Sequence, residues 1–128
     1  MDFYCGTDII EVNRVKDAIQ NTKGFRERVY TNLEIECAEN KGEIVKYEHY
    51  AGRFAAKEAV YKAMSKIDNS ISWKQIEILN DTNNKGRPFV NIYDNQGNVR
   101  KDVNKIDVSI SHIKEFAIAN AVVSIDNK

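Results

Sequence analysis

The sequence predicts an α+β fold, in which helices from the first half of the chain pack on a mainly antiparallel sheet from the second half. Two observations predict it. Apolar residues follow the helical period in the longest segment of the first half, whereas the second half consists of short strand-like runs separated by turn-forming residues. The chain has 128 residues, of which 42% are hydrophobic and 30% charged, the balance of a globular protein. We therefore expect one domain over residues 1–128.

The N-terminal half is expected to form one strand and three helices. Residues 3–12 are rich in aromatic and β-branched side chains, which predicts a strand, and a helix should follow over 13–21 until Gly24 breaks it. The sequence from Thr31 to Glu34 fits a capping box and should open a short helix that Gly42 closes. The longest helix is expected over 43–66.

The C-terminal half is expected to form strands. Residues 76–79 and 89–93 predict two strands joined by the turn 81–86, and Pro88 lies where it can begin a strand without removing a central hydrogen bond. Residues 108–112 and 116–125 predict a final hairpin. In its last strand Ala117, Ala119 and Ala121 alternate with Ile118 and Val122, so both faces are expected to be buried.

The formal net charge is zero, with 19 basic and 19 acidic residues, so the composition gives no case for nucleic acid or an anionic membrane as partner. The charges are nevertheless uneven. Residues 12–30 carry five basic against two acidic side chains, and residues 33–48 carry five glutamates against two lysines. Either both charged segments are simply exposed to solvent, or the basic segment, residues 12–30, contacts an acidic partner.

The two cysteines, Cys5 and Cys37, are too few for a disulfide scaffold. The N-terminus lacks a basic region followed by an apolar stretch, and no run approaches the ~20 apolar residues of a membrane span. We therefore expect a cytoplasmic protein without a membrane partner.

Glu58 is anomalous within the long helix. At 100° per residue it lies on the same stripe as Tyr47, Ala51 and Ala55, and an isolated carboxylate in such a buried stripe is costly. One explanation is a helical ion pair with Lys62, four residues later, worth about 0.2–0.5 kcal/mol on an exposed face. The other is a cation that satisfies Glu58 at the buried end of a cleft. Ile44 begins the stripe and Phe54 borders it.

Asp8 is a second carboxylate in an apolar segment, directly after Gly6 and Thr7 in the predicted first strand. It can be an edge or turn residue, or a cap for the next helix. Two embedded carboxylates also match what Mg²⁺ needs, because this ion binds through one or two carboxylates and completes its octahedron with water and substrate phosphate.

Four short segments together resemble the 4′-phosphopantetheinyl transferase superfamily, in its short, holo-(acyl-carrier-protein) synthase type. Gly6-Thr7-Asp8 is similar to its N-terminal motif, and the run from Arg53 to Lys62 to its helix motif. Gly86-Arg87-Pro88 resembles its glycine–basic–proline turn, and Ser109 to His112 its C-terminal strand. The order and spacing hold from residue 6 to about residue 123. The resemblance implies that family's fold and its enzymatic activity.

The implied reaction transfers 4′-phosphopantetheine from coenzyme A to a serine of an acyl carrier protein and releases adenosine 3′,5′-bisphosphate. By the resemblance, Asp8 and Glu58 hold Mg²⁺, for which Mn²⁺ is a possible substitute, against the pyrophosphate of coenzyme A. The metal neutralises charge on the transferring and leaving phosphates. Lys62 matches a lysine near the transferring phosphate, and Glu58 is also a candidate base for the attacking serine.

The resemblance also implies coenzyme A contacts. Arg53 would bind the 3′-phosphate, Ser111 and His112 would contact phosphates, and Gly86 and Pro88 would shape the adenosine pocket through their backbone. On periodicity alone, His112 is a rim or core histidine. His49 and Trp73 receive no role.

The carrier protein is expected to dock on the basic segment, because carrier proteins of this kind are acidic. The predicted contacts are Arg14, Phe25, Arg26 and Arg28, with a core position as the alternative for Phe25. The family also implies a homotrimer with active sites between subunits.

The chain departs from the family pattern after Lys62, where residues 64–70 contain none of the glycines that the family often has in a phosphate-binding loop. The alternative to an enzyme is therefore a catalytically weak module of the same fold that binds a carrier protein or nucleotide. Asp8, Glu58 and Lys62 favour the enzyme, because docking alone needs none of them.

Overall fold

The structure is a computed structural model that describes residues 1–126. Strand β1 (Asp2–Glu11) leads into the helices α1 (Val12–Asn21), α2 (Phe25–Val29), α3 (Asn32–Glu39) and α4 (Val45–Met64), after which come the strands β2 (Ile76–Asp81), β3 (Arg87–Ile92), β4 (Lys105–His112) and β5 (Phe116–Ile125). Short 3₁₀ turns occupy Trp73–Gln75 and Thr82–Asn84. The α+β prediction is confirmed.

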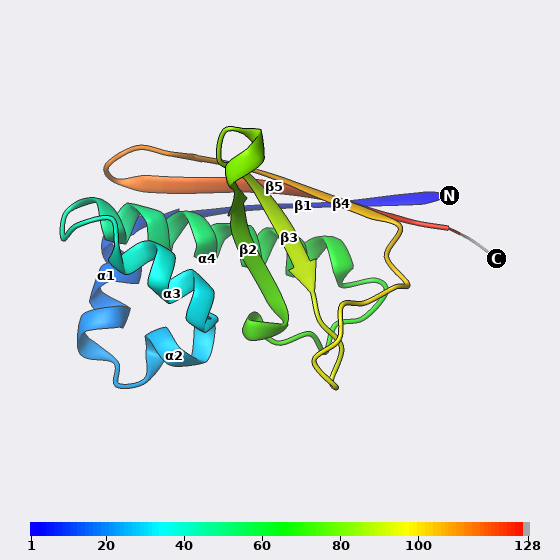
Figure 1. The fold of residues 1–128 in the computed structure, drawn as a ribbon, viewed down its shortest axis with the longest axis horizontal. Helices are drawn as coiled ribbons and strands as arrows, with labels where there is room; N and C mark the ends of the chain where they lie inside the picture. The colour runs from blue at the N-terminus through cyan, green and yellow to red at the C-terminus, as the bar shows by residue number, and fades with distance from the viewer. Residues whose placement is uncertain (127–128) are drawn as a thin grey trace.

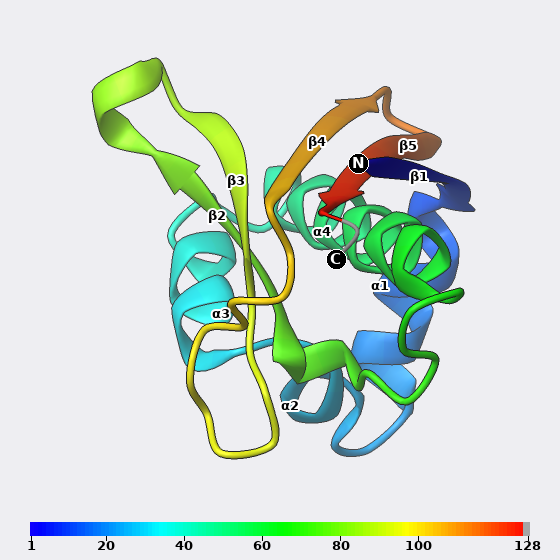
Figure 2. The same cartoon turned by 90° about the vertical axis from the view of Figure 1, so that its right-hand side faces the viewer.

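The strands form two antiparallel sheets (Figures 1 and 2). The larger has the order β1-β5-β4, and the smaller is the hairpin β2-β3. Helix α4 runs beneath the larger sheet, and α1, α2 and α3 lie on the opposite side of α4. Strand β1 thus joins the C-terminal strands, with Asp8 opposite Ala119.

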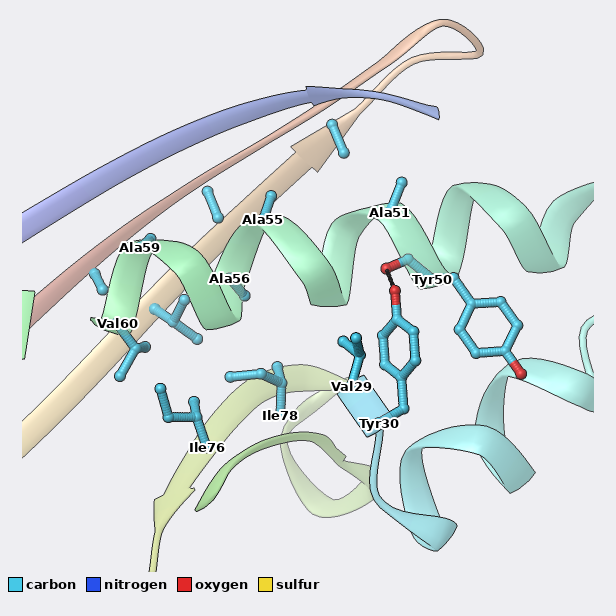
Figure 3. Close-up of a cluster of buried hydrophobic side chains, with 14 of the residues drawn as sticks. Val29, Tyr30, Tyr50, Ala51, Ala55, Ala56, Ala59, Val60, Ile76 and Ile78 are labelled. Carbon is cyan, nitrogen blue, oxygen red and sulfur yellow. Dashed lines mark hydrogen bonds between the residues drawn. The ribbon is translucent and has the colours of Figure 1, made fainter. Parts of the chain in front are cut away.

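The core lies on both sides of α4 (Figure 3). Ala51, Ala55 and Ala59 face the larger sheet, where their small side chains let the helix approach closely. The opposite side of the helix packs on Tyr30 and on β2, where Ile76 and Ile78 are buried. The Tyr30 hydroxyl donates to the Tyr50 carbonyl at 2.8 Å, which satisfies both groups inside the core.

The predicted helix boundaries agree to within two or three residues. Thr31 and Glu34 form the predicted capping box of α3, with the Thr31 N–H donating to Glu34 Oε1 at 2.7 Å. Helix α2 was not predicted, because only five residues separate Gly24 from Tyr30. The predicted buried stripe is wrong at Ile44, which precedes α4 and is exposed.

The prediction that both faces of the last strand are buried is also wrong for the single chain. The alanines of β5 are buried against α4, whereas Ile118 and Val122 are exposed on the outer face of the sheet, because the helices cover only one side. No helix within residues 1–126 is long and apolar enough to cross a membrane.

Candidate active site

The close contact of β1 with α4 brings Asp8 to the C-terminal half of the helix. Gly6 makes this contact possible, since a Cβ at Gly6 would lie 2.0 Å from the Ala59 carbonyl oxygen. Lys62 reaches from the helix to the strand. Its Nζ lies 2.9 Å from the Thr7 carbonyl oxygen and 3.2 Å from Asp8 Oδ1. The Lys62 side chain is 51% exposed and that of Asp8 is 17% exposed, so the pair lies at the surface.

Glu58 lies one helical turn before Lys62 but does not pair with it. Its Oε1 accepts a hydrogen bond of 2.6 Å from the Trp73 indole N–H. Among residues 1–126 no ion pair joins Glu58 to Lys62, so the predicted helical ion pair is wrong. Both side chains instead contact other segments, β1 for Lys62 and the turn before β2 for Glu58.

An apolar cavity of about 340 Å³ adjoins Glu58. It lies between the end of α4 and the start of β2, and its lining is Glu58, Tyr61, Ile71, Ser72, Trp73 and Ile76. Glu58 is its only ionisable carboxylate, so this acidic group borders a space in which apolar ligand atoms can be buried.

The donor chemistry of Asp8 and Glu58 fits a divalent cation. Two carboxylates come from adjacent elements, and within the described chain Asp8 Oδ2 and Glu58 Oε2 form no hydrogen bond or ion pair. Residues 1–126 contain no group of three or more His, Cys, Asp or Glu side chains that could hold a metal ion. Mg²⁺ can bind through two carboxylates, because it retains water and phosphate ligands.

Arg53 extends from α4 toward the β2-β3 hairpin rather than toward Asp8. It is 7% exposed, and its Nη2 donates to Asn80 Oδ1. Burial lowers the pKa of Arg53. The Asn80 side chain in turn donates to the Gly86 carbonyl at 2.6 Å, so Asn80 joins two predicted coenzyme A residues. No sequence pattern singled out Asn80.

Gly86 and Pro88 lie where the hairpin enters β3. Gly86 has φ of 74°, a left-handed conformation that glycine adopts without strain, and Pro88 pairs with Asn80 in the register of the hairpin. The turn before β3 therefore has a conformation that depends on the predicted glycine.

Ser111 and His112 end β4 and are both exposed. His112 Nδ1 lies 3.3 Å from Glu48 Oε1, near the start of α4, which supports a rim position for this histidine. Glu48 and Glu58 are ten residues apart, or about 15 Å along the helix axis. One chain therefore does not bring His112 to the group formed by Asp8, Glu58 and Lys62.

Three of the four predicted docking residues already have partners. Phe25 packs against the core, with its ring centroid 6.3 Å from that of Phe54. Arg26 pairs with Glu27 at 2.7 Å and with Glu39 at 3.3 Å, and the Glu27 bond raises the pKa of Arg26.

Arg28 donates to the Lys23 carbonyl at 3.1 Å. Arg14 is exposed on α1 and makes no ion pair within residues 1–126, which leaves its guanidinium available to an acidic partner.

His49, which received no predicted role, is partly buried near the start of α4. Burial lowers its pKa to about 3, and the charge of nearby Arg53 acts in the same direction. Its Nε2 is buried and has no hydrogen-bond partner within the described residues. The ring is therefore neutral at neutral pH.

Comparison with known proteins reveals relatives over nearly the whole chain. A family model described as 4′-phosphopantetheinyl transferase superfamily matches residues 4–121. A protein of Ruminiclostridium cellulolyticum named holo-[acyl-carrier-protein] synthase is 42% identical, over 98% of this chain and 94% of that protein. One of the same name from Alkaliphilus metalliredigens is 41% identical, over 91% and 94%.

Solved structures of holo-(acyl-carrier-protein) synthases share the fold. One from Bacillus anthracis in complex with CoA (3′,5′-ADP) superposes with a TM-score of 0.78 at 35% identity, covering 96% of both chains. Another from Helicobacter pylori in complex with coenzyme A has a TM-score of 0.75 at 30% identity, covering 94% of this chain and 99% of that one.

Proposed function

The chain belongs to the 4′-phosphopantetheinyl transferase superfamily, and on that premise we propose how its residues transfer 4′-phosphopantetheine from coenzyme A to apo acyl carrier protein. It is an enzyme of the holo-(acyl-carrier-protein) synthase type, and coenzyme A is its substrate. A serine hydroxyl of the carrier protein attacks the phosphate that bears the pantetheine arm. The new bond joins serine oxygen to phosphorus, and the bond to adenosine 3′,5′-bisphosphate breaks.

The observation that supports the proposed site is the contact of Lys62 with Thr7 and Asp8 where β1 crosses α4, with Glu58 one helical turn before Lys62. Asp8 and Glu58 are the residues that would hold Mg²⁺, or Mn²⁺ in its place, through the oxygens that the chain leaves unpaired. When bound, the ion supplies charge neutralisation on the transferring and leaving phosphates.

Lys62 would act on the phosphates directly. Its ammonium has three N–H donors, of which Thr7 and Asp8 take two, so one remains for a phosphate oxygen. It can then give a proton to the leaving phosphate. Glu58 is our candidate to accept the proton of the serine hydroxyl.

The cavity beside Glu58 supports a place for the pantetheine arm. Next to the reacting phosphate the arm has a methylene and then a carbon that bears two methyl groups, and the cavity wall of Tyr61, Ile71 and Trp73 is apolar. We therefore propose that the first part of the arm lies there. Arg53, Gly86 and Pro88, with Ser111 and His112, are our proposed contacts for the nucleotide end of coenzyme A.

We also propose a homotrimer with sites between subunits. Two features support it. His112, a proposed contact for the nucleotide end of coenzyme A, is distant from Glu58 within one chain, so a neighbouring subunit is needed to complete a site. The outer face of the larger sheet exposes an apolar set, comprising Phe3, Ile9, Phe116, Ile118 and Val122, which a neighbouring copy would cover.

We further infer that residues 1–128 act as one domain in the cytoplasm and that the product serves fatty acid biosynthesis. The docking residues proposed for the carrier protein are Arg14, Phe25, Arg26 and Arg28, among which exposed Arg14 has the strongest structural support.

The test is mass spectrometry of apo acyl carrier protein after incubation with the protein, coenzyme A and Mg²⁺. We expect the addition of one phosphopantetheine group, and the loss of that addition in EDTA. Mixing chains that carry Asp8→Ala with chains that carry His112→Ala tests the shared site, because only mixed trimers can contain an intact one. Transfer in EDTA would exclude the metal site, and failure of the mixed chains to regain activity would count against a site between subunits.

A further inference from the structure

Trp73, to which the sequence assigned no role, contacts the carboxylate of Glu58 directly. It is the only tryptophan of the chain and begins the 3₁₀ turn before β2. Its indole N–H donates to Glu58 Oε1 at 2.6 Å, and its ring forms part of the wall of the adjoining cavity. The indole N–H is a donor only, so this bond requires that Glu58 Oε1 be the acceptor.

The backbone of Trp73 is held from inside the protein. Lys57 Nζ donates to the Trp73 carbonyl at 2.9 Å and to the Ile76 carbonyl. Lys57 also pairs with Glu34 at 2.7 Å, and both side chains are fully buried. Glu34 Oε2 accepts the Ile78 N–H at 2.8 Å, so the same pair fixes the start of β2. The turn that carries Trp73 is thereby attached to α4 and α3.

The ring of Trp73 is held from a second side. Its centroid lies 6.2 Å from that of Phe54, at an interplanar angle of 40°. Phe54 lies one helical turn before Glu58, on the same helix. The indole therefore has restraints on its backbone, its ring and its N–H, although the side chain is partly exposed. Such restraints favour one orientation of Glu58 over the other rotamers of an exposed glutamate.

We propose that Trp73 is a positioning residue for Glu58. Its N–H occupies Oε1 and directs Oε2 outward, toward the position where a divalent cation and the coenzyme A phosphates would bind. Carboxylates that bind metals are themselves commonly hydrogen-bonded, and loss of such a bond typically costs about 10- to 100-fold in metal affinity or activity. This inference rests on the proposed function, because it assumes that Glu58 is a metal ligand.

The indole N–H of Trp73 can be replaced without changing the rest of the side chain. Because Trp73 is the sole tryptophan, growth of a tryptophan auxotroph on benzothienylalanine replaces only its indole N–H by sulfur and retains the ring shape. We expect this protein, and Trp73→Phe, to bind Mn²⁺ about tenfold more weakly by electron paramagnetic resonance. The kcat for transfer should fall about tenfold, with the KM for carrier protein unchanged.

Tyr61→Phe is the matched control. Tyr61 lines the same cavity, but its hydroxyl donates to the Asn69 carbonyl at 2.8 Å and does not contact Glu58. This variant also loses one hydrogen bond at the cavity, but the lost bond is not to Glu58. It should therefore retain the wild-type affinity for Mn²⁺. In the wild-type protein, Mn²⁺ should quench the fluorescence of Trp73, and Glu58→Gln should abolish the quenching, which would place the ion beside Trp73 and make its binding depend on Glu58.

The outcomes separate this inference from the proposed function. If the benzothienylalanine protein binds Mn²⁺ and transfers phosphopantetheine as the wild type does, the positioning role is wrong while the proposed function stands. If the wild type binds no Mn²⁺, or transfers fully in EDTA, the metal site is wrong and the positioning role falls with it, while the mass of the carrier protein separately decides whether transfer occurs.

Discussion

Helix α4 carries two lysine–carboxylate pairs only five residues apart, and their surroundings differ completely. Lys57 and Glu34 lie 2.7 Å apart with both side chains fully buried. Lys62 and Asp8 lie 3.2 Å apart with both side chains partly exposed. The first pair is enclosed by backbone groups, which take the other two donors of Lys57 and donate to both carboxylate oxygens of Glu34. The second retains a free N–H and a free carboxylate oxygen.

The difference separates a structural pair, Lys57 and Glu34, from the pair that we propose to be functional, Lys62 and Asp8. A buried charge is tolerated only when its partners are complete, so the pair of Lys57 and Glu34 has no capacity left for a ligand. Burial lowers the pKa of Lys57, and the charge of Glu34 opposes that shift. The pair of Lys62 and Asp8, here called the open pair, contributes little to stability because water screens the two charges. Both residues can therefore exchange this contact for one to a phosphate.

The largest expected effect concerns the carboxylates of the open site. Asp8→Ala or Glu58→Ala should lower kcat for transfer by about 1,000-fold or more, equivalent to about 4 kcal/mol, because charge stabilisation is lost in the transition state. The free energy of unfolding should change little. Mass spectrometry of carrier protein and urea unfolding measure the two quantities. Full turnover by Glu58→Ala would remove Glu58 from the site.

For the closed pair, Lys57 and Glu34, we expect a large effect on stability. Lys57→Met should lower the free energy of unfolding by about 3–5 kcal/mol, because it leaves the Glu34 carboxylate buried without its partner. Urea unfolding at low temperature measures this loss. The double variant Lys57→Met, Glu34→Gln serves as the control and should be more stable than the sum of the single effects predicts. A destabilisation below about 1 kcal/mol would mean that the pair is not structurally important.

The sequence singled out the residues of the proposed open site more readily than those of the closed pair. Asp8 and Glu58 were recognisable because each is a carboxylate inside an apolar segment. The bond of Glu58 to Trp73 was not predictable, since it depends on how a turn 15 residues later folds back on α4. Likewise, the pairing of β1 with β5 joins residues more than a hundred positions apart, and the link from Arg53 through Asn80 to Gly86 depends on the packing of the hairpin.

The closed pair gave only a partial signal. Glu34 was predicted as a capping residue of α3, which the structure confirms, but its ion pair with Lys57 is a tertiary contact between two helices. Lys57 belongs to the segment that resembles the family motif, where sequence reasoning directs attention to Glu58 and Lys62. The burial of a lysine cannot be inferred from a helix that is apolar on more than one side.

Lys62 tests whether the open pair is catalytic or merely electrostatic. Lys62→Ala should lower kcat about 100-fold, with a smaller effect on the KM for coenzyme A, if the ammonium stabilises the transition state. Its cost in stability should be a few tenths of a kcal/mol, because the side chain is half exposed. Steady-state kinetics measure kcat and KM, and a thermal melt of the same variant measures the change in stability. A change in KM alone would assign Lys62 to substrate binding instead.

The smallest expected effect concerns the basic face of α1 and α2. There the comparison is between Arg14, which has no ion pair within residues 1–126, and Arg26, which already has two. Arg14→Glu should raise the KM for carrier protein about tenfold, through slower association, and leave the KM for coenzyme A unchanged. Arg26→Glu should have a smaller effect, because Arg26 already pairs with Glu27 and Glu39.

Salt and a distant charge reversal provide the controls for this last prediction. In 0.5 M salt the Debye length falls to about 4 Å, so the wild type should lose the advantage that Arg14 provides. Lys101→Glu reverses an exposed charge in the loop between β3 and β4, outside this face, and should retain the wild-type KM. If Arg14→Glu and Lys101→Glu are indistinguishable at low salt, an unpaired surface arginine does not mark the docking site, and the carrier protein binds elsewhere.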